Sequence, residues 1–198
     1  MKTLLTFFLI IFAVTSNAQD FKKDVAAAKT AYNTGKLEDA HFALQQMLVQ
    51  MDITIGKEVI KLLPPKLDTL SANVKEDNVM GNVTFVGATI HRSYGLGTKK
   101  ADIEIVNNSP LLGTLNAFLT SPLLANLGSD GKSKVLKVQG FKSRLTKEDN
   151  SNTNTASYKL EIPLSNALIT MSVNNTSENE LMSFANALPL DKIAKLIQ

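Results

Sequence analysis

The chain has 198 residues, of which 44% are hydrophobic, and 21 lysines and arginines against 18 acidic residues give it a formal net charge of +3. The basic residues are scattered, whereas nucleic-acid-binding proteins gather them on one face or in one run, so we expect no nucleic-acid partner. The chain contains no cysteine, which excludes disulfides, thiolate catalysis, thiolate metal ligands and a lipid anchor on an N-terminal cysteine.

The first eighteen residues have the pattern of a secretory signal peptide. Lys2 provides a charged start, Leu4–Val14 is an uncharged apolar run, and Ser16-Asn17-Ala18 places small residues where signal peptidase cleaves. The apolar run is far shorter than the roughly 20 residues needed to span a bilayer, which favours a cleaved signal over an anchoring helix. We therefore expect cleavage after Ala18 and a mature chain without a membrane span in the bacterial periplasm or outside the cell.

Residues 19–63 form a predicted helical segment. Apolar residues recur at helical spacing on both sides of Gly35, which predicts two antiparallel helices about a short turn, followed by a further helix over about Ile55–Leu63. Residues 28–44 resemble one tetratricopeptide unit, with small side chains where the paired helices touch. Only one copy is visible and about three are needed for a stable solenoid, so we expect a helical hairpin packed on other structure.

Pro64-Pro65 marks the clearest boundary, because two prolines cannot continue a helix. Residues 64–198 are the predicted second domain, in which apolar residues recur with period two, as they do in strands. The strands are expected around Val83, Phe85 and Ile90; Ile103 and Ile105; Leu136 and Val138; Leu160, Ile162 and Leu164; and Ile169, Met171 and Val173. The last two strands are expected to form a hairpin, and Lys147–Thr155 is expected to be a loop.

Helices are predicted between and after these strands. Ser109-Pro110 indicates one helix start, and Ser121-Pro122 indicates a second, short helix that carries Leu123, Leu124 and Leu127. Ser177 and Glu180 have the spacing of a capping box, and Asp191 opens a last helix through Ile197. The predicted fold class is α+β: an N-terminal helical hairpin followed by a mostly antiparallel sheet covered by helices.

The motifs of common catalytic sites are missing. No Gly-x-Ser-x-Gly elbow is present, and Gly131-Lys132-Ser133 lacks the earlier glycine of a phosphate-binding loop. His41 and His91 are the only histidines, and neither has another histidine or a cysteine at ligand spacing. We therefore predict no catalytic residues, no metal and no cofactor.

Two groups of polar residues are candidates for ligand binding. His91, Arg92 and Tyr94 bring an imidazole, a guanidinium and a phenol together in a predicted turn after a strand. Asp102 and Glu104 alternate with two isoleucines, so they lie on the strand face that points away from the core. The alternatives are an ordinary hairpin for the first group and a solvated sheet surface for the second. The leucine-rich segment Leu111–Leu127 could line a pocket for a lipid-like ligand, but its spacing fits a helix packed on the sheet better.

Several segments together resemble an uncharacterised family of exported bacterial proteins over roughly Leu62–Ile197. They are Leu62-Leu63-Pro64, the run Ala101–Leu112, Ser121-Pro122-Leu123-Leu124, and the closing pattern of Leu181, Phe184, Ala185, Leu188 and Leu190. The order of elements is also similar to the PsbP-type fold of extrinsic photosystem proteins, which implies an antiparallel sheet between helices. No motif carries that fold's cofactor or partner residues onto this chain, so the photosynthetic role is not transferred.

Taken together, these features favour an exported, non-catalytic binding or accessory protein with a protein or small-molecule partner in the cell envelope. One alternative is a hydrolase acting on envelope material, with its chemistry near His91 and the face of Asp102 and Glu104. A second alternative is a carrier of a lipid-like ligand, held beneath the leucine-rich segment.

Overall fold

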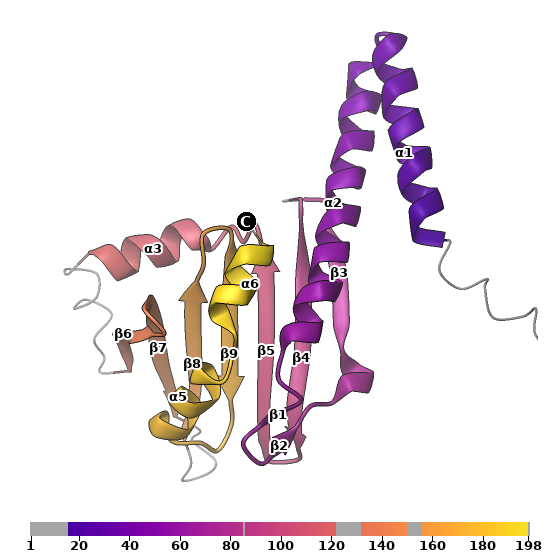
Figure 1. Ribbon diagram of the computed structural model, residues 1–198. Helices are drawn as coiled ribbons and strands as arrows, with labels where there is room; N and C mark the ends of the chain where they lie inside the picture. The colour runs from indigo at the N-terminus through magenta and orange to yellow at the C-terminus, as the bar shows by residue number, and fades with distance from the viewer. Residues whose placement is uncertain (1–15, 85, 122–131, 150–155, 198) are drawn as a thin grey trace, which may run out of the picture. The chain divides into compact units, whose positions relative to one another are not determined.

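The computed structural model describes residues 16–84, 86–121, 132–149 and 156–197, and it has an α+β fold (Figure 1). The predicted signal peptide lies almost entirely outside these residues, as does the predicted short helix at Leu123–Leu127. The chain divides into two compact units, with the boundary between Met51 and Asp52. Within the described residues, no helix is long and apolar enough to cross a membrane.

The first unit is the predicted helical hairpin. Helix α1 (Ser16–Asn33) and the first part of α2 (Leu37–Leu62) are joined by a turn in which Gly35 has a φ of +74°, a conformation that glycine adopts without strain. Ala28 of α1 and Ala40 of α2 are both buried within this hairpin. Small side chains at these positions allow the two backbones to approach closely.

Helix α2 is one continuous helix, so the prediction of a separate helix over Ile55–Leu63 is wrong. Gly56 lies inside this helix, where it is a packing position against the sheet. A Cβ atom there would lie 2.7 Å from Cγ1 of Val79 and 3.0 Å from Cγ1 of Ile90. Residues 52–62 of α2 therefore lie directly on the sheet, and they belong to the second unit.

The second unit is built on a seven-stranded antiparallel sheet with the strand order β3-β4-β5-β9-β8-β7-β6 (Figure 1). Its strands are β3 (Asn78–Asn82), β4 (Gly87–Leu96), β5 (Lys99–Asn107), β6 (Ser133–Val138), β7 (Phe141–Asp149), β8 (Ala156–Pro163) and β9 (Ala167–Val173). A small sheet of β1 (Lys66–Leu67) and β2 (Leu70–Ser71) and the 3-10 helix η1 (Val74–Glu76) precede them. The predicted hairpin of the last two strands is confirmed as β8 and β9.

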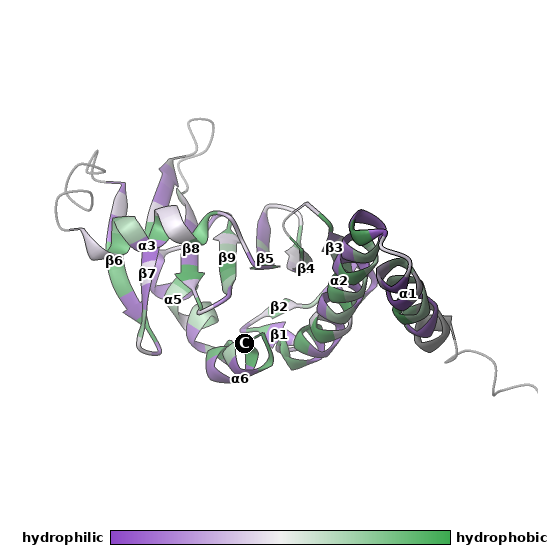
Figure 2. Ribbon diagram, turned by 90° about the horizontal axis from the view of Figure 1, so that it is seen from above, coloured by the Kyte–Doolittle hydropathy of each residue, from purple (hydrophilic) through white to green (hydrophobic). Residues whose placement is uncertain are grey.

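One face of the large sheet, here called the core face, carries the main hydrophobic core. It is covered by the second part of α2, by α5 (Glu178–Asn186) and by α6 (Leu190–Leu196), as Figure 2 shows from above. Val59, Phe184 and Ile193 bring the three helices into this core. Helix α5 begins as predicted, because the Ser177 side chain accepts a hydrogen bond from the Glu180 backbone N–H.

The opposite face of the sheet is covered at one end by α3 (Leu112–Thr120), which contacts β7 and β8. Leu115 and Leu119 are buried there against Leu168 of β9. The helix starts at Leu112, two residues later than a helix with Pro110 at its first position would, and the Ser109 hydroxyl accepts from the Leu111 N–H (3.3 Å). The rest of this face, here called the polar face, carries mostly hydrophilic side chains, with Met80, Val106 and Val135 as the apolar exceptions.

Two strand predictions need correction. The strand expected around Val83 is wrong, because β3 ends at Asn82 and Val83 lies in the turn that follows it. Strand β7 was not predicted, and it occupies the first part of the loop expected at Lys147–Thr155. Its core face includes the fully buried Ser143, whose hydroxyl donates to the Phe141 carbonyl oxygen, so a polar residue interrupts the apolar period.

Candidate functional site

Strand β4 runs through the predicted turn, and this decides where the candidate residues lie. His91 and Arg92 are in the middle of the ten-residue strand, not in the turn after a strand as predicted. Because successive strand residues point to opposite faces, His91 lies on the polar face, and Arg92 and Tyr94 lie on the core face. The structure therefore separates the first predicted group into two.

Register brings His91 together with the second predicted group. His91 pairs with Glu104 of β5 across the sheet, and Asp102 is the next residue of β5 on the same face. The His91 Nε2 atom lies 3.2 Å from Asp102 Oδ1, and the Lys100 Nζ atom lies 3.1 Å from the same oxygen. The side chains of His91 and Asp102 are 35% and 34% exposed, so both can reach a ligand.

The row through His91 continues across the sheet into strands that are distant in sequence. Glu104 pairs with Thr170 of β9, and Asp102 pairs with Ser172 of the same strand. Glu104 is exposed, and it makes no hydrogen bond or ion pair within the described residues; the same is true of the hydroxyls of Thr170 and Ser172. The centre of the polar face thus offers a carboxylate and two hydroxyls whose hydrogen bonds are not satisfied by the rest of the described chain.

A second cluster of charged side chains lies next to this centre, on strands β8 and β7, on the side away from His91. Glu161 of β8 is almost fully buried, its Oε2 accepts a hydrogen bond from Arg144 Nε (2.6 Å), and Arg144 Nη2 lies 2.6 Å from the same oxygen. The Lys159 Nζ lies 3.7 Å from its other oxygen. The Arg144 guanidinium also stacks over the Phe118 ring of α3, 5.3 Å from its centroid. The ion pair and the ring stacking together fix Arg144 in place, as expected for a guanidinium between a carboxylate and an aromatic ring.

Arg92 and Tyr94 form a different network on the core face. Arg92 donates to both oxygens of Asp77, with Nε at 2.8 Å from Oδ1, and its Nη1 donates to the Leu63 carbonyl (3.0 Å). The Tyr94 hydroxyl donates to the Pro64 carbonyl (2.9 Å). The hydrogen bonds that Arg92 donates to Asp77 raise the pKa of Arg92, and burial raises the pKa of Tyr94 to about 12. These two side chains attach the end of α2 to β4 and have no free group to offer a ligand.

The Ser93 hydroxyl, two residues from His91 on the same strand, already has hydrogen-bond partners. Ser93 of β4 donates to Glu76 Oε2 (2.8 Å) and accepts from Asn73 Nδ2 (3.0 Å), so it is not bonded to His91. Among the described residues, no three histidine, aspartate or glutamate side chains are grouped so as to hold a metal ion. Within the described residues, the geometry supplies an imidazole oriented by a carboxylate, but no hydroxyl is hydrogen-bonded to this imidazole as the nucleophile of a hydrolytic triad would be.

Sequence reasoning missed several members of these clusters. Lys159 and Glu161 alternate with buried Leu160 and Ile162, so the period of two could have placed them on the polar face. The pairing of β5 with β9 has no comparable local signal, because it joins segments far apart in sequence. The contribution of Thr170 and Ser172 to the site therefore needed the structure.

A further polar pair lies on the core face at the end of β5. Asn107 is buried, its Nδ2 donates to Asp52 Oδ1 (2.6 Å), and its Oδ1 has no partner within the described structure. Burial raises the pKa of Asp52, and the hydrogen bond from Asn107 partly opposes this. The pair joins the second part of α2 to the sheet. Because the Asn107 Oδ1 atom is buried without a hydrogen-bond partner, the pair contributes less to stability than a fully bonded pair would.

No family model, curated protein or solved structure matches this chain. The candidate site is therefore argued from its own geometry alone. In the leucine-rich segment, Leu115 and Leu119 are used for packing against Leu168, which favours the interpretation of its described part as core over a ligand pocket.

Proposed function

We propose that this chain is an exported, non-catalytic binding protein of the bacterial cell envelope, and that the polar face of the sheet holds its ligand. The observation that carries this proposal is the group of Glu104, Thr170 and Ser172 at the centre of that face. Their carboxylate and hydroxyls lie on adjacent strands and make no hydrogen bonds within the described residues. Export is supported by the charged start, apolar run and small residues of the first eighteen positions.

The chemistry of this centre favours a ligand that donates hydrogen bonds. Glu104 is an acceptor, and each hydroxyl can accept as well as donate. The flanking cations are already engaged, because Lys100 is paired with Asp102 and Arg144 is paired with Glu161. A peptide segment with exposed amide N–H groups or an amine fits this surface, with His91 and Lys159 at its two sides.

The test is capture of peptides from the native envelope, followed by mass spectrometry and by titration of the captured peptide. Glu104→Gln is expected to weaken binding by roughly tenfold to 100-fold, because a hydrogen bond to a charged group contributes about 1.5–3 kcal/mol. Glu38→Gln, the same change on α2 in the other unit, is the matched control and is expected to bind normally. Equal capture by wild type and Glu104→Gln would show that the polar face is not the binding surface.

A hydrolytic role is the second candidate, and the contact between His91 and Asp102 is the observation that favours it. A carboxylate can orient an imidazole and support its action as a general base. If this role is correct, the purified chain will cleave model esters, and His91→Ala will abolish the cleavage. Absence of turnover in the wild-type chain would leave the binding function as the better account.

A further inference from the structure

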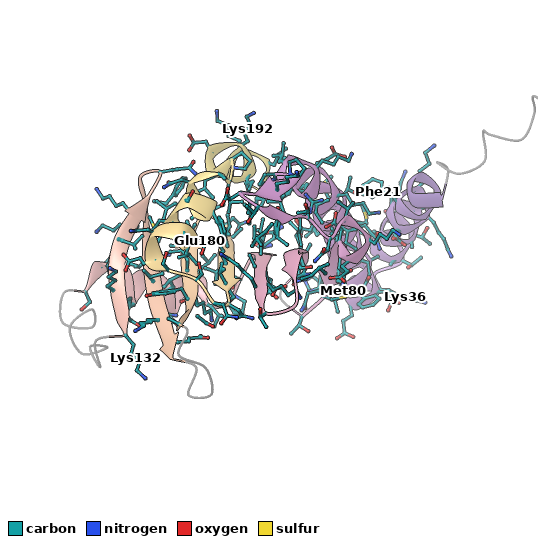
Figure 3. All side chains as sticks on the ribbon, turned by 90° about the horizontal axis from the view of Figure 1, so that it is seen from below. Phe21, Lys36, Met80, Lys132, Glu180 and Lys192 are labelled. Carbon is teal, nitrogen blue, oxygen red and sulfur yellow. The ribbon has the colours of Figure 1, made fainter. Side chains whose placement is uncertain are left out.

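The helical hairpin carries an apolar groove that is open to solvent. Phe21 of α1 and four residues of α2 (Leu44, Met47, Leu48 and Met51) line a hollow of about 270 Å³. Leu44, Leu48 and Met51 are each about half exposed, at 51%, 53% and 52%. Single exposed apolar side chains are ordinary on protein surfaces, but a contiguous group of them marks a place of interaction. Figure 3 shows Phe21 on this hairpin.

The groove residues follow the spacing of a helix that packs against other helices. Leu37, Leu44 and Met51 lie seven residues apart on α2, and Met47 falls between the last two at the position that completes a heptad pattern. On α1, Phe21 and Val25 are one helical turn apart. By this spacing, Val25 and Leu37 are expected on the same side of the hairpin as the groove, and we call these two residues and the groove residues the seam. Two antiparallel hairpins with such seams pack together as a four-helix bundle.

The size of the seam fits a dimer contact. Six of its side chains are exposed: Phe21, Val25, Leu37, Leu44, Leu48 and Met51. If each leaves about 80 Å² open, roughly half of a large side chain, the seam exposes about 500 Å² of apolar surface. A standard interface buries about 800 Å² per partner, of which about 60% is apolar. The seam therefore supplies about the apolar area that one side of a stable interface needs.

The charges beside the seam are also arranged for self-association. On α1, Lys22, Lys23 and Lys29 outnumber Asp20 and Asp24, so this helix has a net charge of +1, whereas residues 37–51 of α2 carry Glu38 and Asp39 and no lysine or arginine. In a twofold dimer with α1 of one protomer against α2 of the other, each contact brings together helices of opposite net charge. The seam itself contains no charged residue, so closing it desolvates none. We propose that a second copy of this chain closes the groove, hairpin against hairpin, as a four-helix bundle.

Sedimentation equilibrium of the purified chain over a range of concentrations tests this directly. We expect a reversible dimer whose Kd rises at least about 100-fold in Leu44→Glu and in Leu48→Glu, with unchanged circular dichroism because both side chains are already half exposed. Val74→Glu is the matched control, since Val74 is 62% exposed and lies outside the hairpin, and its Kd is expected to equal that of the wild type. A chain that is monomeric at every concentration, or a dimer insensitive to both groove variants, overturns the proposal.

The absence of cysteine allows a second, independent measurement. Because the natural chain has no thiol, any cross-link in a Leu48→Cys variant must come from that position. A short bifunctional maleimide is expected to give covalent dimers of Leu48→Cys and far fewer of Val74→Cys. Equal cross-linking of the two variants overturns the proposal, as does a monomer whose groove binds phospholipid vesicles. Neither measurement depends on the polar face, so failure of one proposal leaves the other standing.

Discussion

Two neighbouring residues of β4 show how differently the two faces of the sheet use charge. Arg92 on the core face is almost fully buried, and its partners are a carboxylate and a backbone carbonyl. His91 on the polar face is about one-third exposed and shares its one carboxylate partner with Lys100. A buried charge must be fully paired, because an unpaired one is costly, whereas a partly exposed charge can exchange its partner for a ligand. The first cluster therefore holds the fold, and the second is available for binding.

The largest effect is expected when the core-face cluster loses its cation. Arg92→Met leaves Asp77 poorly solvated and without its partner, and it should lower the free energy of unfolding by about 3–5 kcal/mol. Urea denaturation followed by circular dichroism measures this change. The double variant Arg92→Met with Asp77→Leu should recover most of the loss, because no charge remains unpaired. A loss below about 1 kcal/mol in the single variant would remove the contrast between the two faces.

A smaller effect is expected at the phenol on the same face. Tyr94→Phe keeps the buried ring but removes the donor to the Pro64 carbonyl. The expected loss is about 1 kcal/mol in the free energy of unfolding, the usual contribution of one hydrogen bond together with an acceptor left without its donor. The same denaturation experiment measures it. No measurable change would mean that water replaces the phenol and that this contact does not secure the end of α2.

Replacement of Asp52 is expected to raise the free energy of unfolding, whereas the two replacements above lower it. The native-state pKa of this carboxyl is raised above its ordinary 3.8, so the folded chain holds the proton more tightly than the unfolded chain does. Its contribution to stability is therefore lost as the pH rises from about 3.8 through the raised native pKa. Asp52→Asn removes this loss and adds an amide that can donate to the Asn107 Oδ1.

We expect Asp52→Asn to be about 0.5–1.5 kcal/mol more stable than the wild type at pH 7, with the difference shrinking toward pH 4. Thermal and urea unfolding at several pH values would measure it. A variant that is less stable at pH 7 would show that the charged carboxylate, and not the buried amide, governs the pair of Asp52 and Asn107.

The smallest effect on stability is expected on the polar face. His91→Ala removes a partly exposed side chain with one shared contact, so the free energy of unfolding should change by no more than about 0.5 kcal/mol. Denaturation side by side with Arg92→Met makes the comparison within one strand. A loss of 2 kcal/mol or more would assign His91 to the fold and not to ligand binding.

The parts of the fold that could be predicted are those with a strong local pattern. Ile103 and Ile105, or Leu160 and Ile162, alternate cleanly with polar residues, and both strands were found. Strand β7 was missed because Ser143 takes a buried position that an apolar side chain would normally fill. The continuity of α2 was missed because its two parts pack on different neighbours: the first part packs in the hairpin, and Gly56 and the residues after it pack on the sheet.

The candidate site shows the same limit. Asp102 and Glu104 could be placed on one face because they alternate with isoleucines within a single strand. The same alternation, counted from Ile90, puts Arg92 and Tyr94 on the core face, but the strand runs to Leu96 and so extends beyond the turn predicted at His91. Thr170 reaches Glu104 only through pairing of distant segments, and no periodicity within either strand records that pairing.

The pairing of β5 with β9 also has a consequence for the order in which the chain can fold. Ala101 is paired with Val173, so the middle of the sheet cannot close until almost the whole chain is present. Contacts between such distant residues form slowly, and until they form β5 presents an open hydrogen-bonding edge. A shortened chain that ends before Ala167 would keep this edge open and is expected to aggregate. The last sixth of the sequence, from Ala167 onward, thus protects the preceding residues from pairing with other chains through this edge.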